Sequence, residues 1–384
     1  VRWRGRNGIM DRRGPRLSPP LRLGDNPAVS DPARVTHSVV LHASGKRFEV
    51  AAGESVLEAA QRAGLALPYS CLAGVCGSCK AELLDGAVTY PRNPPSALNA
   101  LERAHHQVLL CQAVPASDLR LAAREVASVA DLPRRVLALR LVRKDRLAPD
   151  VMRLALQPPP GDRLRRLAGQ YLDVLLEDGK RRAFSIANAP HGGDAIELHI
   201  RHVAGGGFTG RVFQQLEPGA VLQVEGPLGT FVPREDSERP LLFVAGGTGF
   251  APVKALVEHF LHLGTRRRMT LYWGARSVDE LYLRELPERW AREVPGFRFV
   301  PVVSDPQCAA GLRSGLVHEA VLEDLPELAD YDIYMSGPPA MIDACRRRFV
   351  EAGLPEARLY YDSFDYAPDV LAQILRNRAG IHGL

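Results

Sequence analysis

The feature that most constrains the fold of this chain is a short loop with three cysteines, followed by a fourth cysteine further along the sequence. The loop reads CLAGVCGSC over residues 71–79, which is the pattern C-x4-C-x2-C. Its two glycines allow backbone N–H groups to turn toward the sulfur atoms without a clash of a Cβ atom. Four thiolates gathered in this way predict a metal centre formed by Cys71, Cys76, Cys79 and Cys111.

The spacing of these cysteines resembles that of plant-type [2Fe–2S] ferredoxins. A zinc site usually joins two short C-x2–4-C hooks, and disulfide frameworks are typical of small secreted domains, so we favour the iron–sulfur cluster over both. Cys308 and Cys345 lie outside the ligand pattern, and we expect ordinary buried thiols at these two positions.

The secondary-structure signals around the cysteine loop resemble the β-grasp fold of such ferredoxins. The expected elements are strands at 39–42, 48–50 and 81–84, a helix over 54–63 that ends at Gly64, and a capped helical turn over 96–103. The order is strand, strand, helix and metal loop, which places the first three cysteines directly after a helix.

Length and charge narrow the class of protein. A chain of 384 residues with 46% hydrophobic residues supports two or three domains with cores of their own. The 49 basic residues are nearly balanced by 44 acidic ones and are scattered, so nucleic-acid binding is not indicated. We find no apolar stretch that could span a bilayer and no signal peptide, and we therefore expect a cytoplasmic protein.

A second motif lies at residues 182–188 (RAFSIAN), which present an arginine, an aromatic ring and a hydroxyl on a predicted strand edge. An arginine binds phosphate oxygens in a bidentate manner, an aromatic ring stacks on a flat ligand, and a hydroxyl both donates and accepts. The segment resembles the R-x-[YF]-S motif of the ferredoxin-NADP reductase superfamily. The resemblance implies that Arg182 meets the phosphate of a flavin, that Phe184 packs on the flavin in place of the commoner tyrosine, and that Ser185 hydrogen-bonds near flavin N5.

A glycine-rich turn at 205–209 (GGGFT) precedes a helix that we expect over 209–216. Exposed N–H groups at a helix start attract an anion, and in this position they predict a site for the flavin pyrophosphate. Taken alone, the turn would be an ordinary flexible loop, and its place after the R-x-F-S segment favours the phosphate site. The expected flavin-binding residues in and before this turn are His199, Arg201, Gly207, Phe208 and Thr209.

The third region alternates strand and helix signals. A buried strand at 241–245 leads into the turn 246–252 (GGTGFAP), in which Pro252 suits a first helical position. The turn has the composition of a dinucleotide-binding loop but lacks the third glycine of G-x-G-x-x-G. Further strands are expected at 269–275, 297–303 and 333–335, so we predict a parallel nucleotide-binding sheet.

Resemblance to the superfamily is strongest in this third region, where AGGTGxAP, YWGAR and SGPPxM follow one another in the expected order. It implies that the nicotinamide nucleotide meets Gly247, Thr248, Gly249, Arg276, Gly337 and Pro338. Ser336 stands where many relatives have a cysteine beside the nicotinamide, and Phe364 is the final aromatic residue near both rings. Ser185, Ser336 and Phe364 are therefore the expected catalytic residues, and we favour NADH, with NADPH as the alternative.

The predicted fold is a multidomain one, with an α+β β-grasp ferredoxin, an antiparallel β-barrel flavin domain and an α/β parallel-sheet nucleotide-binding domain. The expected segments are a disordered basic tail at 1–34, the ferredoxin domain at 35–127, the FAD-binding barrel at 134–236, the NAD(P)-binding domain at 237–365 and a C-terminal tail at 366–384. Within the last tail, apolar residues at helical spacing predict a short amphipathic helix formed around Val370, Leu371, Ile374 and Leu375.

Electron counting gives the expected function. A nicotinamide delivers two electrons as hydride and a [2Fe–2S] centre takes one, so a flavin between them is required to divide the pair. The order ferredoxin, FAD, NAD resembles the reductase components of oxygenases, and this implies a terminal oxygenase as the protein electron acceptor. The stretches at 95–98, 111–113 and 117–119 resemble the CDP-6-deoxy-glucoseen reductase group, which implies a deoxysugar dehydratase as acceptor instead. A redox-sensing module without sustained turnover is the third hypothesis.

Overall fold

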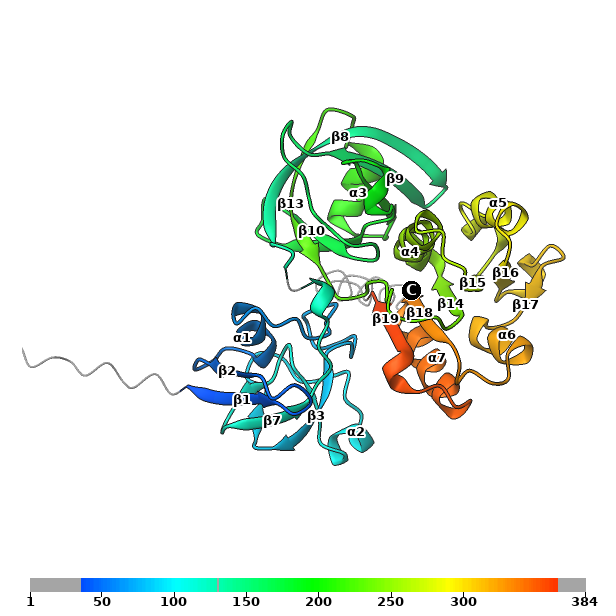
Figure 1. The fold of residues 1–384 in the computed structure, drawn as a ribbon. Coiled ribbons are helices and arrows are strands. Elements are labelled where there is room, and N and C mark those ends of the chain that lie inside the picture. The colour runs from blue at the N-terminus through cyan, green and yellow to red at the C-terminus, as the bar shows by residue number, and fades with distance from the viewer. Residues whose placement is uncertain (1–35, 130, 365–384) are drawn as a thin grey trace, which may run out of the picture. The chain divides into compact units, whose positions relative to one another are not determined.

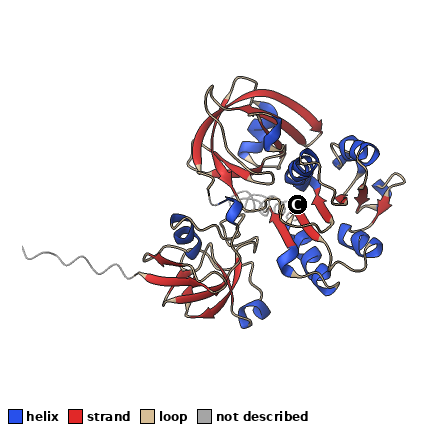
Figure 2. Ribbon diagram, viewed as in Figure 1, coloured by secondary structure: helices blue, strands red, loops and turns tan. Residues whose placement is uncertain are grey.

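The computed structural model describes residues 36–129 and 131–364, in which three large sheets follow one another along the chain (Figures 1 and 2). The tails predicted at 1–34 and 366–384, with the amphipathic helix of the second, lie outside the described residues. In the part that the structure describes, no helix is long and apolar enough to cross a membrane.

The first sheet is mixed and has the strand order β2-β1-β7-β3-β5, with a separate pair β4-β6. The elements are β1 (His37–Leu41), β2 (Arg47–Val50), α1 (Val56–Arg62), β3 (Lys80–Asp85), β4 (Val88–Thr89), α2 (Ala100–Ala104), β5 (Gln107–Leu109), β6 (Val114–Pro115) and β7 (Leu119–Ala122). The strand β1 runs antiparallel to β2 and parallel to β7, as in the predicted β-grasp ferredoxin fold. We refer to this part as the ferredoxin domain.

The two helices of the ferredoxin domain begin at capping boxes. Ser55 caps α1 together with Glu58, and the helix buries the apolar face that its sequence predicts. The helical turn expected over 96–103 begins later, at Ala100, because Asn99 and Glu102 form the capping box there.

The second sheet is antiparallel, in the order β11-β10-β13-β8-β9-β12. Its elements are β8 (Arg135–Ala148), β9 (Val151–Gln157), β10 (Tyr171–Leu175), β11 (Arg181–Ser185), β12 (Ile196–Arg201), α3 (Gly207–Gln214) and β13 (Val221–Leu228). A bridge between Ile186 and Leu198 joins its two edges, which gives the predicted barrel. The helix α3 starts before the predicted Thr209, and its buried Phe208 and Val212 belong to the barrel core (Figure 1).

The third sheet is entirely parallel, in the order β17-β16-β15-β14-β18-β19. Its elements are β14 (Leu241–Gly246), α4 (Phe250–His262), β15 (Met269–Ala275), α5 (Glu285–Glu293), β16 (Phe297–Val303), β17 (Arg313–Ser314), α6 (Val317–Asp324), β18 (Asp332–Gly337), α7 (Pro339–Glu351) and β19 (Leu359–Ser363). Helices α4 and α5 share one core with this sheet, and α6 and α7 share a second core with its opposite face (Figure 1).

Short 3-10 helices occupy several connections: η1 (Ala127–Val129), η2 (Pro190–Gly192), η3 (Gly247–Gly249), η4 (Val278–Glu280), η5 (Pro306–Cys308) and η6 (Glu356–Arg358).

Two local predictions were wrong. Pro252 is the third residue of α4 rather than the first, because η3 runs directly into that helix; within the first turn its missing N–H still costs no helical hydrogen bond. Cys345 is buried as expected, but Cys308 is exposed, because it lies on η5 between strands rather than under the sheet.

Candidate functional site

The four candidate ligand cysteines lie in two close pairs in the ferredoxin domain, Cys71 with Cys76 and Cys79 with Cys111. Cys76, Cys79 and Cys111 are buried, Cys71 is half-buried, and all four are free thiols. The sulfur atoms of Cys79 and Cys111 lie 3.2 Å apart, which brings the fourth cysteine to the loop although it follows α2 in the chain. Among the described residues, no His, Cys, Asp or Glu side chains are grouped as one metal ion would require; a [2Fe–2S] centre divides four thiolates between two irons.

The backbone of the cysteine loop turns toward the sulfur atoms. The N–H group of Ala73 donates to Cys71 Sγ at 3.4 Å, and that of Ser78 donates to Cys76 Sγ at 3.5 Å. Hydrogen bonds from the Cys76 thiol and from backbone N–H groups hold the pKa of Cys71 below its usual value. Backbone donors of this kind stabilise a thiolate ligand. The hydrogen bond to the neighbouring cysteine and burial act in the opposite direction on Cys76 and Cys79, whose pKa values are raised.

A close approach explains one of the loop glycines. Gly74 has φ +79°, and a Cβ atom there would lie 2.9 Å from Gln112 Cγ. Gln112 in turn donates to the carbonyl of Leu72 at 2.7 Å, so the residue after the fourth cysteine holds the loop from outside.

The R-x-F-S segment forms β11, which is an edge strand of the barrel as predicted. The ring of Phe184 is half-buried and lies 5.5 Å from the ring of Phe208, so the two expected flavin-binding aromatics are together. Arg182 and Ser185 are half-buried on the same strand. An arginine, an aromatic face and a hydroxyl on one exposed edge fit a flavin phosphate and ring.

The glycine-rich turn leads into α3 through Gly206, and the Thr209 hydroxyl closes it. Thr209 Oγ1 accepts from the N–H of Val203 at 3.1 Å and lies 3.3 Å from the carbonyls of Val203 and Gly206. Gly207 is exposed at the start of the helix. The hydroxyl of Thr209 therefore shapes the turn, and the N–H groups of the helix start remain for an anion.

Arg201 stands at the end of β12 and reaches toward the third sheet. Its Nη1 lies 3.4 Å from Glu280, its Nε lies 3.4 Å from Asp150, and its Nη2 would lie 3.7 Å from a Cβ atom added at Gly247. Within the described residues, Nε and Nη2 are buried and have no hydrogen-bond partner. A buried arginine fork with unused N–H groups beside a glycine-rich loop is suited to a phosphate.

The nucleotide loops after β14 and β18 pack directly on each other. A Cβ atom on Gly249 would lie 1.9 Å from the carbonyl oxygen of Ser336, so a residue other than glycine does not fit there. Trp273 Nε1 donates to the carbonyl of Gly247 at 3.0 Å. Gly337 and Pro338 complete the second loop, with Pro338 as the N-cap of α7. The loops lie at the carboxyl ends of parallel strands, where open α/β sheets bind nucleotides.

Three further predicted residues surround these loops. Ser336 is fully buried, and its hydroxyl has no hydrogen-bond partner in the described part of the chain. The N–H of Phe364 donates to the carbonyl of Gly337 at 3.2 Å, which brings the final aromatic to the second loop. The Arg276 side chain is 77% exposed and its Nη2 lies 2.6 Å from Glu280, so it stands at the rim of the site.

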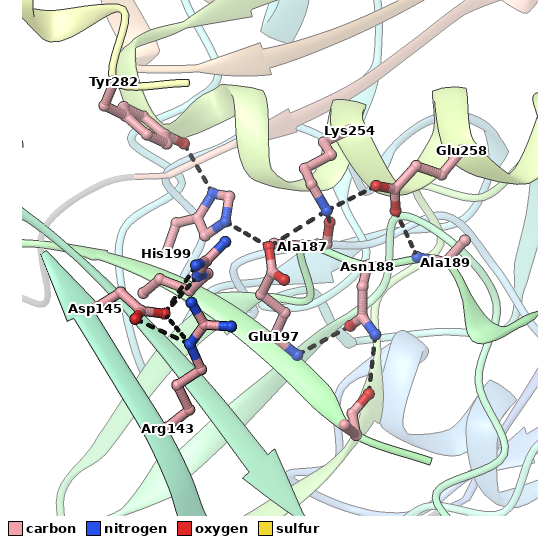
Figure 3. A network of polar contacts seen from close by, with 12 residues as sticks. Arg143, Asp145, Ala187, Asn188, Ala189, Glu197, His199, Lys254, Glu258 and Tyr282 are labelled. Carbon is pink, nitrogen blue, oxygen red and sulfur yellow. Dashed lines mark hydrogen bonds and ion pairs between the residues drawn. The ribbon is translucent and has the colours of Figure 1, made fainter. Parts of the chain in front are cut away.

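A buried polar network joins the barrel to α4 (Figure 3). Glu197 and His199 extend from β12, and Lys254 extends from α4. Lys254 Nζ lies 3.3 Å from Glu197 Oε1, which in turn lies 2.8 Å from His199 Nε2. The other ring nitrogen of His199 lies 3.0 Å from the hydroxyl of Tyr282. Both nitrogens of this predicted flavin-binding residue are thus engaged with protein groups.

The same lysine has two more partners. Lys254 Nζ donates to the carbonyl of Ala187 at 3.0 Å and lies 2.8 Å from Glu258, whose carboxylate also accepts from the N–H of Ala189 at 3.2 Å. The side chain of Lys254 is 8% exposed. We call Glu197, His199, Lys254, Glu258 and Tyr282 the lysine junction; it fixes the helix after the first nucleotide loop to the strand after the R-x-F-S segment.

A second junction joins all three sheets. Asp362 on β19 is buried, and its carboxyl group hydrogen-bonds to Ser70 Oγ and, at 3.2 Å, to Ser185 Oγ. We call Ser70, Ser185 and Asp362 the carboxyl junction. Of these three residues, only Ser185 lies in a motif that predicts a role. The segment 360–364 (YYDSF) carries the aspartate but gives no sign that it meets two hydroxyls far away in the chain.

Comparison with known protein families supports the division of the chain into three domains. Residues 39–116 match the family model "2Fe-2S iron-sulfur cluster binding domain", 138–232 match "Oxidoreductase FAD-binding domain", and 243–347 match "Oxidoreductase NAD-binding domain". Fold and site thus define an NAD(P)H-dependent oxidoreductase with an iron–sulfur centre, FAD and a nicotinamide nucleotide as cofactors.

Relatives match the whole arrangement. The CDP-6-deoxy-L-threo-D-glycero-4-hexulose-3-dehydrase reductase of Yersinia pestis is 37% identical over 85% of this chain and 98% of its own length. Reductase component 1 of terephthalate 1,2-dioxygenase from Comamonas is 36% identical over 87% and 99%. The crystal structure of the Amycolatopsis cytochrome P450 reductase GcoB superimposes with a TM-score of 0.68 at 33% identity, over 86% of this chain and 99% of that one.

These matches cover the described domains from end to end, so the chain belongs to the three-domain iron–sulfur flavoprotein reductases of the ferredoxin-NADP reductase superfamily. Its function is electron transfer from a nicotinamide nucleotide through FAD and a [2Fe–2S] centre to a protein partner.

Proposed function

We propose that this reductase supplies electrons from NADH to a terminal oxygenase component, and that Cys71, Cys76, Cys79 and Cys111 hold its cluster. The observation that carries the proposal is the convergence of the cysteine loop, β11 and the nucleotide loops on one small region through Asp362. The predicted cytoplasmic location accompanies this proposal.

Each set of residues has a distinct task in this proposal. Bound FAD accepts two electrons at once from a nicotinamide and releases them singly, so it links the two-electron and one-electron partners. Arg182 and the start of α3 would hold the flavin phosphates, Phe184 would pack on its ring with Phe208 of the barrel core behind it, and Ser185 would present a hydroxyl to the reacting edge.

The nucleotide loops bring the nicotinamide to the same edge. Gly247, Thr248 and Gly249 form the turn, in which Gly249 leaves no room for a Cβ atom and Gly247 has φ +53°. Arg201 Nη2, which has no hydrogen-bond partner in the described residues, would be available to a phosphate there. Ser336 lies buried under the second loop and Phe364 is hydrogen-bonded to it, so both would lie beside a bound nicotinamide. Arg276 at the rim would meet the ribose end of the nucleotide, where NADH and NADPH differ.

Substitution of one cysteine tests the cluster site. In Cys79→Ser the iron content of the purified protein falls and the iron–sulfur absorption is lost, while FAD stays bound and is still reduced by NADH. Cys345→Ser is the matched control, because that thiol is buried in the nucleotide-binding domain away from the loop. A variant Cys79→Ser that retains its full cluster would contradict the assignment.

A second candidate acceptor is a sugar dehydratase, which the 37% identity to the Yersinia pestis dehydrase reductase supports. The two are separated by NADH oxidation in the presence of either the oxygenase component of Comamonas terephthalate dioxygenase or the Yersinia dehydrase, each with its substrate. The proposal predicts faster turnover with the oxygenase component. Faster turnover with the dehydrase would favour the second candidate, and product formation with neither would count against both.

A further inference from the structure

One buried carboxyl group contacts the cysteine loop and the R-x-F-S strand at the same time. Asp362 is 5% exposed, and its Oδ1 hydrogen-bonds to the hydroxyl of Ser70, the residue before Cys71. Its Oδ2 lies 3.2 Å from the hydroxyl of Ser185. The start of the cysteine loop and the hydroxyl proposed to meet the flavin therefore share one partner.

Two tyrosines on β10 and β19 also hydrogen-bond to the backbone of the cysteine loop and of the residue before it. The hydroxyl of Tyr171, on β10, donates to the carbonyl of Ser70 at 2.6 Å, and the hydroxyl of Tyr361, on β19, donates to the carbonyl of Gly77 at 3.0 Å. Tyr171 is the cross-strand partner of Ser185, but its hydroxyl bonds to the backbone of the loop and not to the Ser185 hydroxyl. Asp362 is the side chain that links the two hydroxyls.

The chemistry of this contact does not require a cation. In the described residues Asp362 forms no ion pair, and burial raises the pKa of its carboxyl group, although hydrogen bonds from Ser70 and Ser185 act in the opposite direction. A protonated carboxyl group donates one hydrogen bond and accepts another, and each serine hydroxyl does the same. The three groups can therefore satisfy one another without any charge in the buried space.

We propose that Asp362 is a positioning residue, which sets the place of the cysteine loop relative to Ser185 and thereby the rate of electron transfer from the flavin site to the cluster. The inference rests on the proposed function of these residues. Electron transfer slows steeply with distance, so a loop released from Asp362 passes electrons more slowly. Reduction of the flavin by NADH depends on β11 and the nucleotide loops and does not require the loop contact.

Ser70→Ala separates the two steps, because it removes the loop side of the contact and leaves the pair Asp362–Ser185 in place. Anaerobic stopped-flow mixing of the full-length, cofactor-loaded protein with NADH follows flavin and iron–sulfur absorption separately. We expect flavin bleaching at the wild-type rate and cluster bleaching slowed by about tenfold, on the scale of one lost hydrogen bond. Ser96→Ala is the matched control: its hydroxyl bonds to the carbonyl of Gly74 at 3.2 Å from within the ferredoxin domain, and we expect wild-type rates.

Variants of the aspartate distinguish positioning from general packing. Asp362→Ala slows cluster bleaching at least as much as Ser70→Ala, and the double variant is no slower than Asp362→Ala alone, because both remove the same contact. Asp362→Asn restores the rate, since an amide also donates to one serine and accepts from the other. Cluster bleaching at the wild-type rate in Ser70→Ala and Asp362→Ala would overturn the inference, as would an Asp362→Asn variant as slow as Asp362→Ala.

Amide hydrogen exchange provides a readout without turnover. Exchange of residues 70–79 is expected to be about tenfold faster in Ser70→Ala and Asp362→Ala than in the wild type and unchanged in Asp362→Asn. Equal protection in all four proteins would overturn the inference. If instead the wild-type cluster is never bleached by NADH while the exchange pattern is as expected, the proposed function fails and the positioning role of Asp362 stands.

Discussion

The lysine junction and the carboxyl junction both connect domains through polar side chains, the first with charged groups and the second with hydroxyls and one carboxyl group. Each joins polar side chains of different domains at buried or half-buried positions. In the lysine junction a cation, Lys254, lies between the carboxylates of Glu197 and Glu258, whereas in the carboxyl junction two hydroxyls meet Asp362, which forms no ion pair in the described residues. Charge makes the first contact costly to break, and the second, held by hydrogen bonds, is easier to release.

This difference matches the two steps that the junctions serve. The lysine junction holds the helix after the first nucleotide loop against the flavin barrel, where two rings must meet face to face. The carboxyl junction holds the ferredoxin domain, whose cluster must also give its electrons to a separate protein. We therefore expect the first to dominate stability and the second to affect electron transfer.

The largest expected effect is that of Lys254→Met. It leaves the half-buried carboxylates of Glu197 and Glu258 without their cation, and we expect the free energy of unfolding to fall by about 3 kcal/mol, the lower end for broken buried pairs. Urea denaturation of the apoprotein measures it. Lys46→Met is the matched control, because that lysine pairs with Glu125 at the surface and contributes about 0–1 kcal/mol. Equal losses of unfolding free energy in Lys254→Met and Lys46→Met would mean that the lysine junction contributes no more to stability than a surface ion pair.

The pH dependence of the lysine junction comes next. Burial disfavours the charged form of Glu197, but the hydrogen bond with His199 and the charge of Lys254 outweigh it and lower its pKa to about 2. The stabilisation, on the order of 3 kcal/mol, is therefore present above the unfolded pKa of about 4.5 and lost as the pH falls toward 2.

Glu197→Gln removes this dependence. Its free energy of unfolding should lie well below that of the wild type at pH 6 and approach it at pH 3, as measured by urea denaturation at the two values. A constant difference between the two proteins at both pH values would show that Glu197 does not ionise as described.

Two tyrosines sharpen the comparison at a smaller scale. Tyr282→Phe removes the hydroxyl beside His199, and Tyr171→Phe removes the one that donates to Ser70. Each should cost about 1 kcal/mol of unfolding free energy. Of these two variants, we expect only Tyr171→Phe to speed amide exchange in the cysteine loop. Faster exchange in the loop of Tyr282→Phe would mean that the lysine junction also stabilises the loop and that the two junctions are coupled.

The smallest effect is the pH dependence of the carboxyl junction, and it has the opposite sign. The folded state raises the pKa of Asp362, so its contribution is fully present below the unfolded value of 3.8 and is lost as the pH rises through the folded one. Asp362→Asn cannot ionise, and relative to the wild type it should gain stability as the pH increases. Thermal unfolding followed from about pH 4 upward tests this, and a relative loss would contradict the sign.

The sequence predicts local features of this protein well. The strands at 269–275 and 297–303 are observed at the predicted residues, because continuous apolar runs between turns leave a buried parallel strand little freedom. The cysteine loop and the R-x-F-S strand are likewise short segments whose composition carries their conformation. The late start of α2 was missed because Asn99 and Ser96 are both good caps, and the choice depends on Glu102.

The junctions could not be predicted in this way. Asp362 lies 292 positions from Ser70 and 177 from Ser185 in the chain, and no periodicity relates them. Lys254 reads as one polar residue of an amphipathic helix, and Glu197 as one polar residue of a strand; their pairing depends on how two domains pack. His199 shows the same limit, since nothing in the sequence indicates that its ring nitrogens face Glu197 and Tyr282, and its cofactor contact stays a prediction.

The central claim is that electrons enter at the nucleotide loops and leave through the cysteine loop of the same chain. An anaerobic titration of the purified protein with NADH, with flavin and iron–sulfur absorption recorded separately, tests it most directly. The account predicts that both bands bleach in the wild type and that the flavin band alone bleaches in Cys79→Ser. Bleaching of the flavin without the cluster in the wild type would contradict it.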